Sequence, residues 1–219
     1  MTPSFETLRA AMIDSQLRPT GVNDVRVIEA FMPVPREAFV PAAARALAYL
    51  DAEIPLGNGR VVMEPMLFGN LVMRAELTPR DRVLLIGAAS GYEAAVIARL
   101  VADVVAVESD PALAVSARAA LAKVGAINVD IVDAPLTEGW PSGAPYDVLF
   151  LNGAGEMIPP ALVDQLSEGG RFVGVLADGG GLPHACAGRK GGGVIGRVDF
   201  LDAGGAPLPG FERPRGFRF

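Results

Sequence analysis

Residues 83–92, Val-Leu-Leu-Ile-Gly-Ala-Ala-Ser-Gly-Tyr, join a short apolar run to a turn that contains two glycines. The apolar run predicts a buried strand, and the residues after the turn predict a helix that starts near Tyr92. Glycine permits backbone conformations and close approaches that other residues do not, and a helix N-terminus presents free N–H groups to a ligand. The stretch therefore predicts a strand–turn–helix unit that binds a nucleotide-like cofactor.

Short apolar runs alternate with helix signals beyond this unit. Asp110-Pro111 is typical of a helix start, and Gly125 is typical of a helix stop. Short, wholly apolar strands that alternate with helices indicate a parallel sheet covered on both faces. We therefore predict an α/β fold with a doubly wound, mostly parallel sheet. Further strands are expected at 104–107, 129–132, 148–151 and 172–176, a last strand that could run antiparallel at 194–200, and helices at 92–101 and 159–166.

The residues ahead of this unit predict several short helices. One should begin at Asn23 or Asp24, either of which can cap it, and end before Pro33. The other helical stretches are expected at 5–17, at 36–47 and from Pro65 onward.

The chain divides by pattern into two regions. We expect a helical addition at 1–78 and a Rossmann-like domain at 79–219, folded together as one compact unit. Glycine clusters at 179–181 and 191–193 indicate turns or loops. The end of the chain, 207–219, is rich in Pro, Gly and Arg and is expected to wrap the surface.

Composition limits the possible partners. The formal net charge of -6 and the pI near 4.9 disfavour nucleic acid, which requires a basic surface. One cysteine, Cys186, and one histidine, His184, are too few for a structural zinc site or an internal disulfide. We expect a buried Cys186 and, in an irregular C-terminal stretch, a surface or structural His184. Without a long apolar run or a signal peptide, the chain is expected to be cytoplasmic, with no membrane partner.

An acidic residue follows the glycine turn at an informative distance. Glu108 ends the next predicted strand, 21 positions after Gly87. In doubly wound folds an acid at this spacing accepts hydrogen bonds from ribose hydroxyls. The turn is not G-x-G-x-x-G, so a dinucleotide is disfavoured. The alternative is that Gly87 and Gly91 only form a tight strand-to-helix turn.

Several segments, in order along the chain, resemble protein-L-isoaspartate O-methyltransferases, a family of class I S-adenosylmethionine-dependent enzymes. The resemblance runs from about Asp24 to Leu176 and includes Ser90-Gly91-Tyr92 and Glu108. It implies a Rossmann-like methyltransferase fold, S-adenosylmethionine as cofactor, and a protein or peptide substrate. Such enzymes methylate the free carboxylate of an isoaspartyl residue, which begins protein repair. The other matching segments are 34–41, 56–59, 139–141, 144–147, 159–162, 165–166 and 169–171.

The resemblance also implies site residues. Met63 and Glu64 match the substrate loop, and Asn152 ends the fourth predicted strand, where ligands bind in open α/β sheets. The expected catalytic group is therefore Met63, Glu64 and Asn152. The expected cofactor-binding residues are Gly87, Ala88, Ala89, Ser90, Gly91, Tyr92, Glu108, Asp133 and Ala134. No metal is expected.

Several residues depart from the family pattern. Met63 stands where the family has a serine, and its thioether cannot donate a hydrogen bond to a carboxylate. Glu64 adds a negative charge beside the expected acceptor carboxylate. Leu85 and Ala89 replace an acid and a glycine of the turn. Pro135 replaces the acid near the adenine, where Asp133 could substitute after a local shift.

Three functions therefore stay open, with the enzyme favoured. The first is a methyltransferase that acts on a carboxylate, isoaspartyl or another. The second is a non-catalytic relative that keeps the fold and has lost methyl transfer. The third lies between them: the cofactor binds, but Met63 and Glu64 select a more apolar or cationic acceptor.

Overall fold

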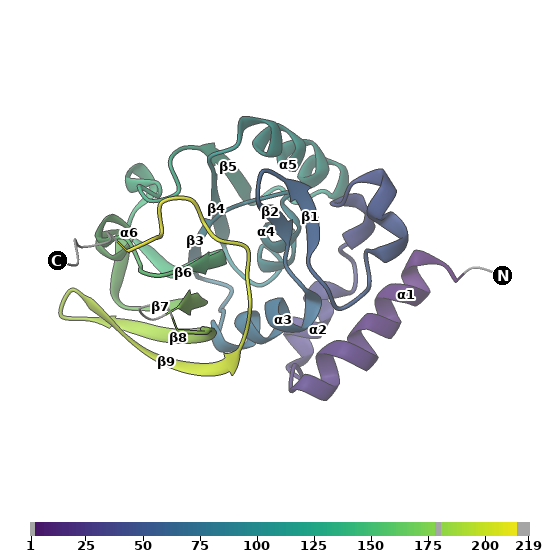
Figure 1. Cartoon of the computed structure of the whole chain (residues 1–219), viewed down its shortest axis with the longest axis horizontal. Coiled ribbons are helices and arrows are strands. Elements are labelled where there is room, and N and C mark those ends of the chain that lie inside the picture. The colour runs from purple at the N-terminus through teal and green to yellow at the C-terminus, as the bar shows by residue number, and fades with distance from the viewer. Residues whose placement is uncertain (1–2, 178–180, 214–219) are drawn as a thin grey trace.

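Seven strands form the central sheet, in the spatial order β5-β4-β3-β6-β7-β8-β9 (Figure 1). The first five in this order are parallel, whereas β8 and β9 are each antiparallel to the preceding strand. The computed structural model describes residues 3–177 and 181–213. The strands are β3 (Arg82–Ile86), β4 (Asp103–Glu108), β5 (Val129–Asp133), β6 (Tyr146–Gly155), β7 (Leu166–Ala177), β8 (Pro183–Gly191) and β9 (Val194–Asp202).

The two faces of the sheet pack against different hydrophobic clusters. Val83 and Leu85 of β3 belong to a large cluster shared with the N-terminal helices, α4 and α5. Leu84 and Ile86 point the other way, into a smaller cluster with residues of α6 and the C-terminal segment. This alternation places the sheet in the core, as wholly apolar strands predict. The helices are α1 (Phe5–Met12), α2 (Val25–Phe31), α3 (Pro65–Arg74), α4 (Tyr92–Ile97), α5 (Pro111–Val124) and α6 (Pro160–Gln165).

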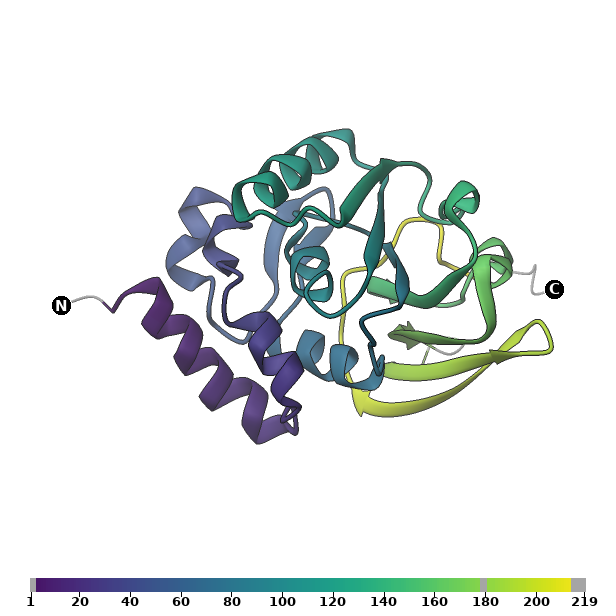
Figure 2. The same ribbon diagram turned by 180° about the vertical axis from the view of Figure 1, so that it is seen from behind.

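Helix α1 and the turn of the β8–β9 hairpin lie toward opposite ends of the molecule, whereas α3 contacts β8 (Figures 1 and 2). Helix α2 begins where the Asp24 side chain accepts a hydrogen bond from the Arg26 N–H at 2.8 Å. In the same way α5 begins at Asp110 and ends at Gly125, whose φ is 71°. These capping predictions are confirmed, and they explain why the helices start and stop where they do.

Some predicted elements are wrong. The expected helix at 36–47 is two 3-10 segments, Arg36–Ala38 and Ala42–Leu47, because Pro41 interrupts it. A β-hairpin that the sequence did not indicate, β1 (Ile54–Gly57) with β2 (Arg60–Val62), follows them.

The irregular stretch expected around His184 is also wrong, because it contains strand β8. This strand has small and polar residues but lies between β7 and β9, so backbone pairing on both sides holds it. The Nδ1 atom of His184 lies 3.0 Å from an Asp202 carboxylate oxygen, and Cys186 is buried as expected. Of the predicted turn at 179–181, residues 179 and 180 lie outside the described residues.

The chain after β9 returns across the carboxyl edge of the parallel strands, as the yellow trace in Figure 1 shows. We call residues 206–211 the C-terminal strap. The N–H of Ala154 in β6 donates to a strap carbonyl at 2.8 Å, and its carbonyl accepts from the Leu208 N–H at 2.7 Å. Pro207, Pro209 and Gly210 are exposed, so the segment runs along the surface as expected, and the buried side chains of Leu208 and Phe211, each 1% exposed, anchor it. Residues 214–219 lie outside the described part.

In the part of the chain that the structure describes, no helix has the length and apolar character needed to cross a bilayer.

Candidate cofactor and acceptor site

The glycine turn lies at the carboxyl end of β3, the strand at which the order of strand addition reverses. From β3 the chain proceeds to β4 and β5 on one side and returns to β6 on the other. Ligands of open α/β sheets bind at such a switch point. Gly87 and Gly91 have φ of 86° and 90°, and Ala89 has φ of 51°. The first glycine allows both the Gly87 and Ala88 N–H groups to donate to the Val107 carbonyl, each at 2.9 Å.

Glu108 holds this turn from the end of β4. Its side chain is completely buried. One carboxylate oxygen accepts from the Ala89 N–H at 2.7 Å, and the other accepts from the N–H groups of Ser109 and Asp110 at 2.9 and 3.1 Å. A buried carboxylate is stable only when it is paired and hydrogen-bonded, and these donors meet part of that need.

Arg60 completes the pairing of Glu108, and the sequence did not indicate it. It lies on β2, is 4% exposed, and its guanidinium donates to the Glu108 carboxylate at 3.2 Å. Its Nε atom is buried without a hydrogen-bond partner in the described structure. In the sequence Arg60 is simply a charged residue before Val61 and Val62, and this local pattern does not indicate a contact with β4.

The predicted catalytic residues Met63 and Asn152 are linked by a second buried acid, Glu93. One carboxylate oxygen of Glu93 accepts from the Met63 N–H at 3.0 Å, and the other accepts from the Asn152 amide at 3.3 Å. The same amide donates to the Gly87 carbonyl at 2.8 Å. Burial raises the pKa of Glu93, and the positive charge of Arg36 opposes that shift. The structure thus joins the substrate loop, the turn and the end of β6.

Arg36 fixes the other side of Met63. It is fully buried and donates to the carbonyls of Met63 at 2.6 Å and Ala48 at 2.7 Å. Its guanidinium also lies over the Tyr92 ring, 4.8 Å from the ring centroid. Tyr92 is fully buried and packs against Phe39, so its ring lies in the core behind the turn. Burial raises the pKa of Tyr92 to about 12.

Glu64 lies at the entrance to α3, in acidic surroundings. Partial burial, together with the carboxylates of Asp51 and Glu53, raises its pKa. Met63 beside it is 2% exposed, so its thioether lies in the core. Of the two predicted acceptor-site residues in this loop, only Glu64 therefore carries a charge toward the surface.

The remaining predicted cofactor residues have different surroundings. Asp133 pairs with Glu108 across β4 and β5, but its exposed carboxylate binds Arg118 at 2.7 Å. The Ala134 N–H donates to the Glu108 carbonyl at 3.2 Å. Ser90 is buried, and its hydroxyl has no hydrogen-bond partner in the described structure.

Two side chains lie directly over Gly87. A Cβ atom placed on this glycine would collide with the Arg60 guanidinium and would lie 3.1 Å from a methyl of Leu208. It would also lie 3.1 Å from the Asn152 carbonyl. Leu208 likewise contacts the place of a Cβ on Gly153, at 2.8 Å. The protein's own residues therefore leave no room for a side chain at position 87 or 153.

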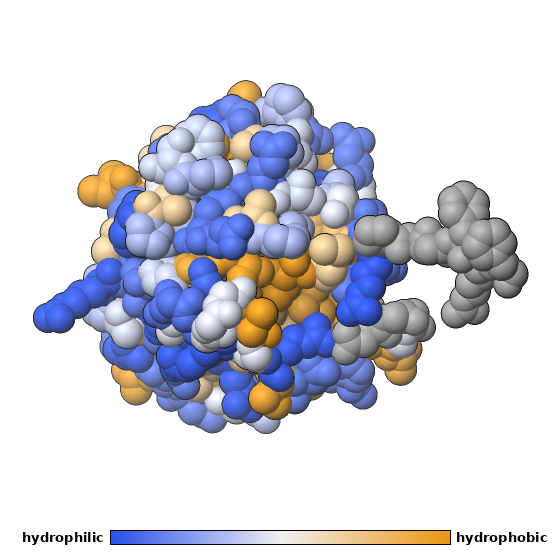
Figure 3. Space-filling model, turned by 90° about the vertical axis from the view of Figure 1, so that its left-hand side faces the viewer, coloured by the Kyte–Doolittle hydropathy of each residue, from blue (hydrophilic) through white to orange (hydrophobic). Residues whose placement is uncertain are grey.

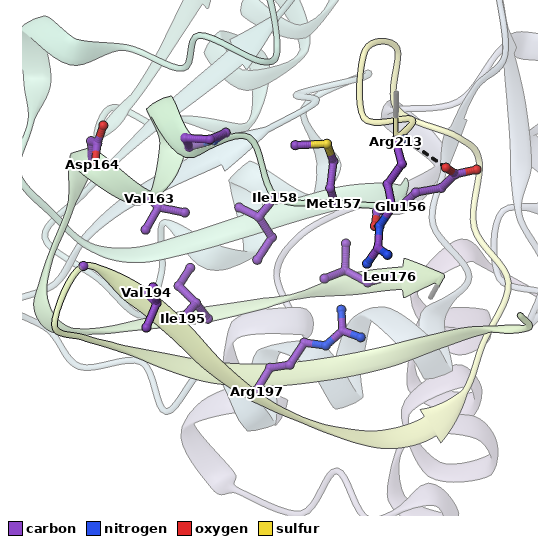
Figure 4. A pocket seen from close by; sticks show the side chains of 12 residues that line it. Glu156, Met157, Ile158, Val163, Asp164, Leu176, Val194, Ile195, Arg197 and Arg213 are labelled. Carbon is purple, nitrogen blue, oxygen red and sulfur yellow. Dashed lines mark hydrogen bonds between the residues drawn. The ribbon is translucent and has the colours of Figure 1, made fainter. Parts of the chain in front are cut away.

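Two open cavities lie near the carboxyl edge of the sheet. One of about 410 Å³ is bounded by Asn58, Arg60, Asp110 and Pro209. A larger one, of about 570 Å³, lies between the end of β6, α6 and the β8–β9 hairpin (Figure 4). Apolar side chains gather in a hollow on this side of the molecule (Figure 3). None of the sequence-predicted site residues lines the larger cavity.

The strand order, the glycine turn and the acid at the end of the next strand define a class I methyltransferase fold. A solved protein-L-isoaspartate O-methyltransferase is similar over 94% of this chain, with a TM-score of 0.81 and 24% identity, and this chain spans 66% of its length. The chain belongs to the protein-L-isoaspartate(D-aspartate) O-methyltransferase family, whose model matches residues 8–179.

Individual relatives agree with this assignment. The chain is 41% identical over 170 residues to protein-L-isoaspartate O-methyltransferase 1 of Rhodopseudomonas palustris, covering 78% of this chain and 69% of the relative. It is 38% identical over 206 residues to protein-L-isoaspartate O-methyltransferase 2 of Marinobacter nauticus, covering 94% of each. A Plasmodium falciparum structure in complex with S-adenosyl-L-homocysteine has a TM-score of 0.77, with 16% identity, over 94% of this chain and 99% of its own.

The predicted family, its methyltransferase fold and its cofactor, S-adenosylmethionine, are confirmed. The relatives favour the methyltransferase over a non-catalytic relative. The division at residue 78 and the roles of the site residues stay predictions.

Proposed function

We propose that this protein transfers the methyl group of S-adenosylmethionine to the free carboxylate of isoaspartyl residues in damaged proteins, and that it acts in the cytoplasm. The observation that carries the proposal is the buried Glu108 carboxylate held against the Gly87–Gly91 turn at the switch point of the sheet. The family match and the names of the relatives support it.

Two residues of the turn region have the chemistry that binding of S-adenosylmethionine requires. Gly87 has no side chain beside the turn, and Glu108 supplies a carboxylate, the group that accepts hydrogen bonds from ribose hydroxyls; here that carboxylate is buried and bound by Arg60 and backbone N–H groups. When bound, the cofactor supplies a sulfonium-activated methyl group. The protein then has to orient the acceptor carboxylate and exclude water. In this structure Arg60 and Leu208 occupy the place where a side chain at residue 87 would lie, so only glycine fits at this position.

On the acceptor side, two buried charged side chains hold the backbone of the substrate loop. The Glu93 carboxylate accepts from the Met63 N–H, and the Arg36 guanidinium donates to the Met63 carbonyl. These two hydrogen bonds hold the substrate loop in place. Met63 cannot donate to an acceptor carboxylate. Arg60 provides a guanidinium on the same segment, and guanidinium groups bind carboxylates through two parallel hydrogen bonds.

A methyl-transfer assay tests the proposal. The protein is incubated with labelled S-adenosylmethionine and either an isoaspartyl peptide or the same peptide with ordinary aspartate. We expect label in the isoaspartyl peptide alone, in a base-labile ester, and a large loss of transfer in Glu108→Gln. Asp130→Asn, an exposed change on β5, is the control and should retain full transfer. Absence of transfer to the isoaspartyl peptide at millimolar concentration would refute it.

A different acceptor is the second candidate, because Glu64 with Asp51 and Glu53 places negative charge beside the loop. Such surroundings repel a carboxylate and favour a cationic or neutral acceptor. Transfer to protein extracts depleted of isoaspartate, together with none to the isoaspartyl peptide, would favour this candidate.

A further inference from the structure

Strand β9 forms one side of the central sheet. Among the described residues it pairs with β8 alone, and no strand lies along its other side, which we call the outer edge of β9 (Figure 1). The strand is nine residues long, from Val194 to Asp202. A strand edge of this length presents backbone N–H and C=O groups that can pair with another strand.

The hairpin turn between β8 and β9 determines which backbone groups face the outer edge. Gly192 and Gly193 form a two-residue turn with φ of 59° and 80°, the signs of a type I′ turn. The two residues that flank such a turn form a hydrogen-bonded pair, and bonded and non-bonded pairs then alternate along the hairpin. The N–H and C=O groups of Ile195, Arg197 and Asp199 therefore point away from β8, toward the outer edge.

The side chains along this edge are complementary to those of a second copy of the same strand. Arg197 and Asp199 lie on one face of β9, with the Arg197 Nε atom 3.7 Å from the Asp199 carboxylate. Val198 lies between them on the other face and is 72% exposed. When two β9 strands run antiparallel with the two-fold axis at Val198, Arg197 of each copy lies opposite Asp199 of the other. One register therefore satisfies both the outward backbone groups and the charges.

We propose that the outer edge of β9 binds a second copy of this chain, in an antiparallel and two-fold symmetric pair centred on Val198. The pair continues the seven-stranded sheet of one copy into that of the other. The two Val198 side chains meet at the axis, in a non-hydrogen-bonded pair with about 4.5 Å between the Cα atoms. A register shift adds one residue to β9 after Asp199 and ends the regular stretch. The interface is therefore small, and the dimer forms only at high protein concentration.

A charge exchange tests this proposal by sedimentation equilibrium, over a series of protein concentrations up to millimolar. We expect a monomer–dimer equilibrium in the wild type. Arg197→Asp and Asp199→Arg each place like charges opposite one another, so each should weaken dimerisation by about tenfold or more. Mixed in equal amounts, the two variants should form a heterodimer, because every acid then faces an arginine. Lys123→Asp, the same change of charge at an exposed position of α5, is the control and should dimerise as the wild type does.

A cysteine at the two-fold axis tests the register independently. Val198→Cys brings two thiols together in the dimer at a separation that suits a disulfide, whereas Cys186 is buried. Val194→Cys is the matched control, because Val194 is 67% exposed on the same strand but lies far from its counterpart in the second copy. We expect mild oxidation to produce a covalent dimer of Val198→Cys and none of Val194→Cys. Adding Arg197→Asp to Val198→Cys should suppress the covalent dimer.

Three outcomes would overturn the proposal, and circular dichroism shows that each variant is folded. The first is a wild type that stays monomeric at every concentration. The second is a dimer that neither charge variant weakens or that the mixture fails to restore, because such a dimer uses another surface. The third is equal cross-linking at Val198 and Val194. The proposal does not depend on methyl transfer, so the proposed function stands in each case.

Discussion

The guanidinium of Arg60 lies 3.2 Å from the carboxylate of Glu108, and the two side chains are 4% and 0% exposed. The pair joins the hairpin that precedes the substrate loop to the strand that precedes the helix α5. Breaking a buried pair from one side leaves an uncompensated charge, which is strongly destabilising.

Arg60→Met should therefore lower the free energy of unfolding by about 3 kcal/mol, since Glu108 becomes a buried charge without a counterion. Urea denaturation at neutral pH measures this loss. Adding Glu108→Gln to Arg60→Met should recover most of it, because the buried charge is then gone. Arg18→Met removes an exposed pair with Asp14 and should cost about 0.5 kcal/mol or less. Equal losses in Arg60→Met and Arg18→Met would contradict the interpretation.

Ala89→Gly should stabilise the protein by up to about 1 kcal/mol, because Ala89 has a φ of 51°, where an L side chain is strained. The gain is limited by the greater flexibility of glycine in the unfolded chain. Ala119→Gly, at an exposed position of α5, is the control and should cost about 1 kcal/mol. A loss of stability in Ala89→Gly as large as in the control would show that the turn is not strained at this position.

Glu64 predicts a pH-dependent stability. Its pKa is raised above the ordinary value of 4.5 in the folded protein by partial burial, Asp51 and Glu53. The folded state therefore binds more protons than the unfolded state just above pH 4.5, and stability attributable to this group falls as pH rises through that window. Glu64→Gln should raise the melting temperature more at pH 7.5 than at pH 4. The same increase at both values would exclude Glu64 as the source.

Glu64 should also weaken the binding of an isoaspartyl acceptor. Glu64→Gln is expected to lower KM for the isoaspartyl peptide about fivefold with little change in kcat, since a charge pair near water contributes about 1 kcal/mol. The difference should shrink at high salt, because salt screens exposed charges. Glu138→Gln, an exposed acid elsewhere, should leave KM unchanged. A KM that does not respond to Glu64→Gln would show that the loop charge does not face the acceptor.

Much of the fold could be predicted from local patterns. The run 83–86 became β3, and the capping residues Asp24 and Asp110 begin α2 and α5. Strand β8 could not be predicted, because its small and polar residues carry no alternation and its pairing with β7 and β9 comes from distant segments. The hydrophobic pattern of a segment predicts a helix or strand only where the side chains of that segment provide most of its stability.

The candidate site divides in the same way. The turn and Glu108 could be predicted because Glu108 follows Gly87 by the 21 positions that are typical of this fold. Arg36 and Glu93 were not identified as the residues that hold Met63, because their contacts join α4 and the 3-10 segments to the substrate loop. Arg36 lies in the matching segment 34–41, but only the tertiary structure shows that it and Glu93 are buried and hydrogen-bonded to Met63.

The sequence by itself determined the family, the doubly wound sheet, the position of the turn and the acid at the end of the next strand. Each depends on the order and spacing of residues within one stretch of chain. Only the tertiary structure decided that Arg60 and Leu208 meet above Gly87. Those three residues belong to separate segments. They meet because the fold brings the carboxyl edge of the sheet, the β1–β2 hairpin and the strap to one place, where close packing leaves no room for a side chain at residue 87.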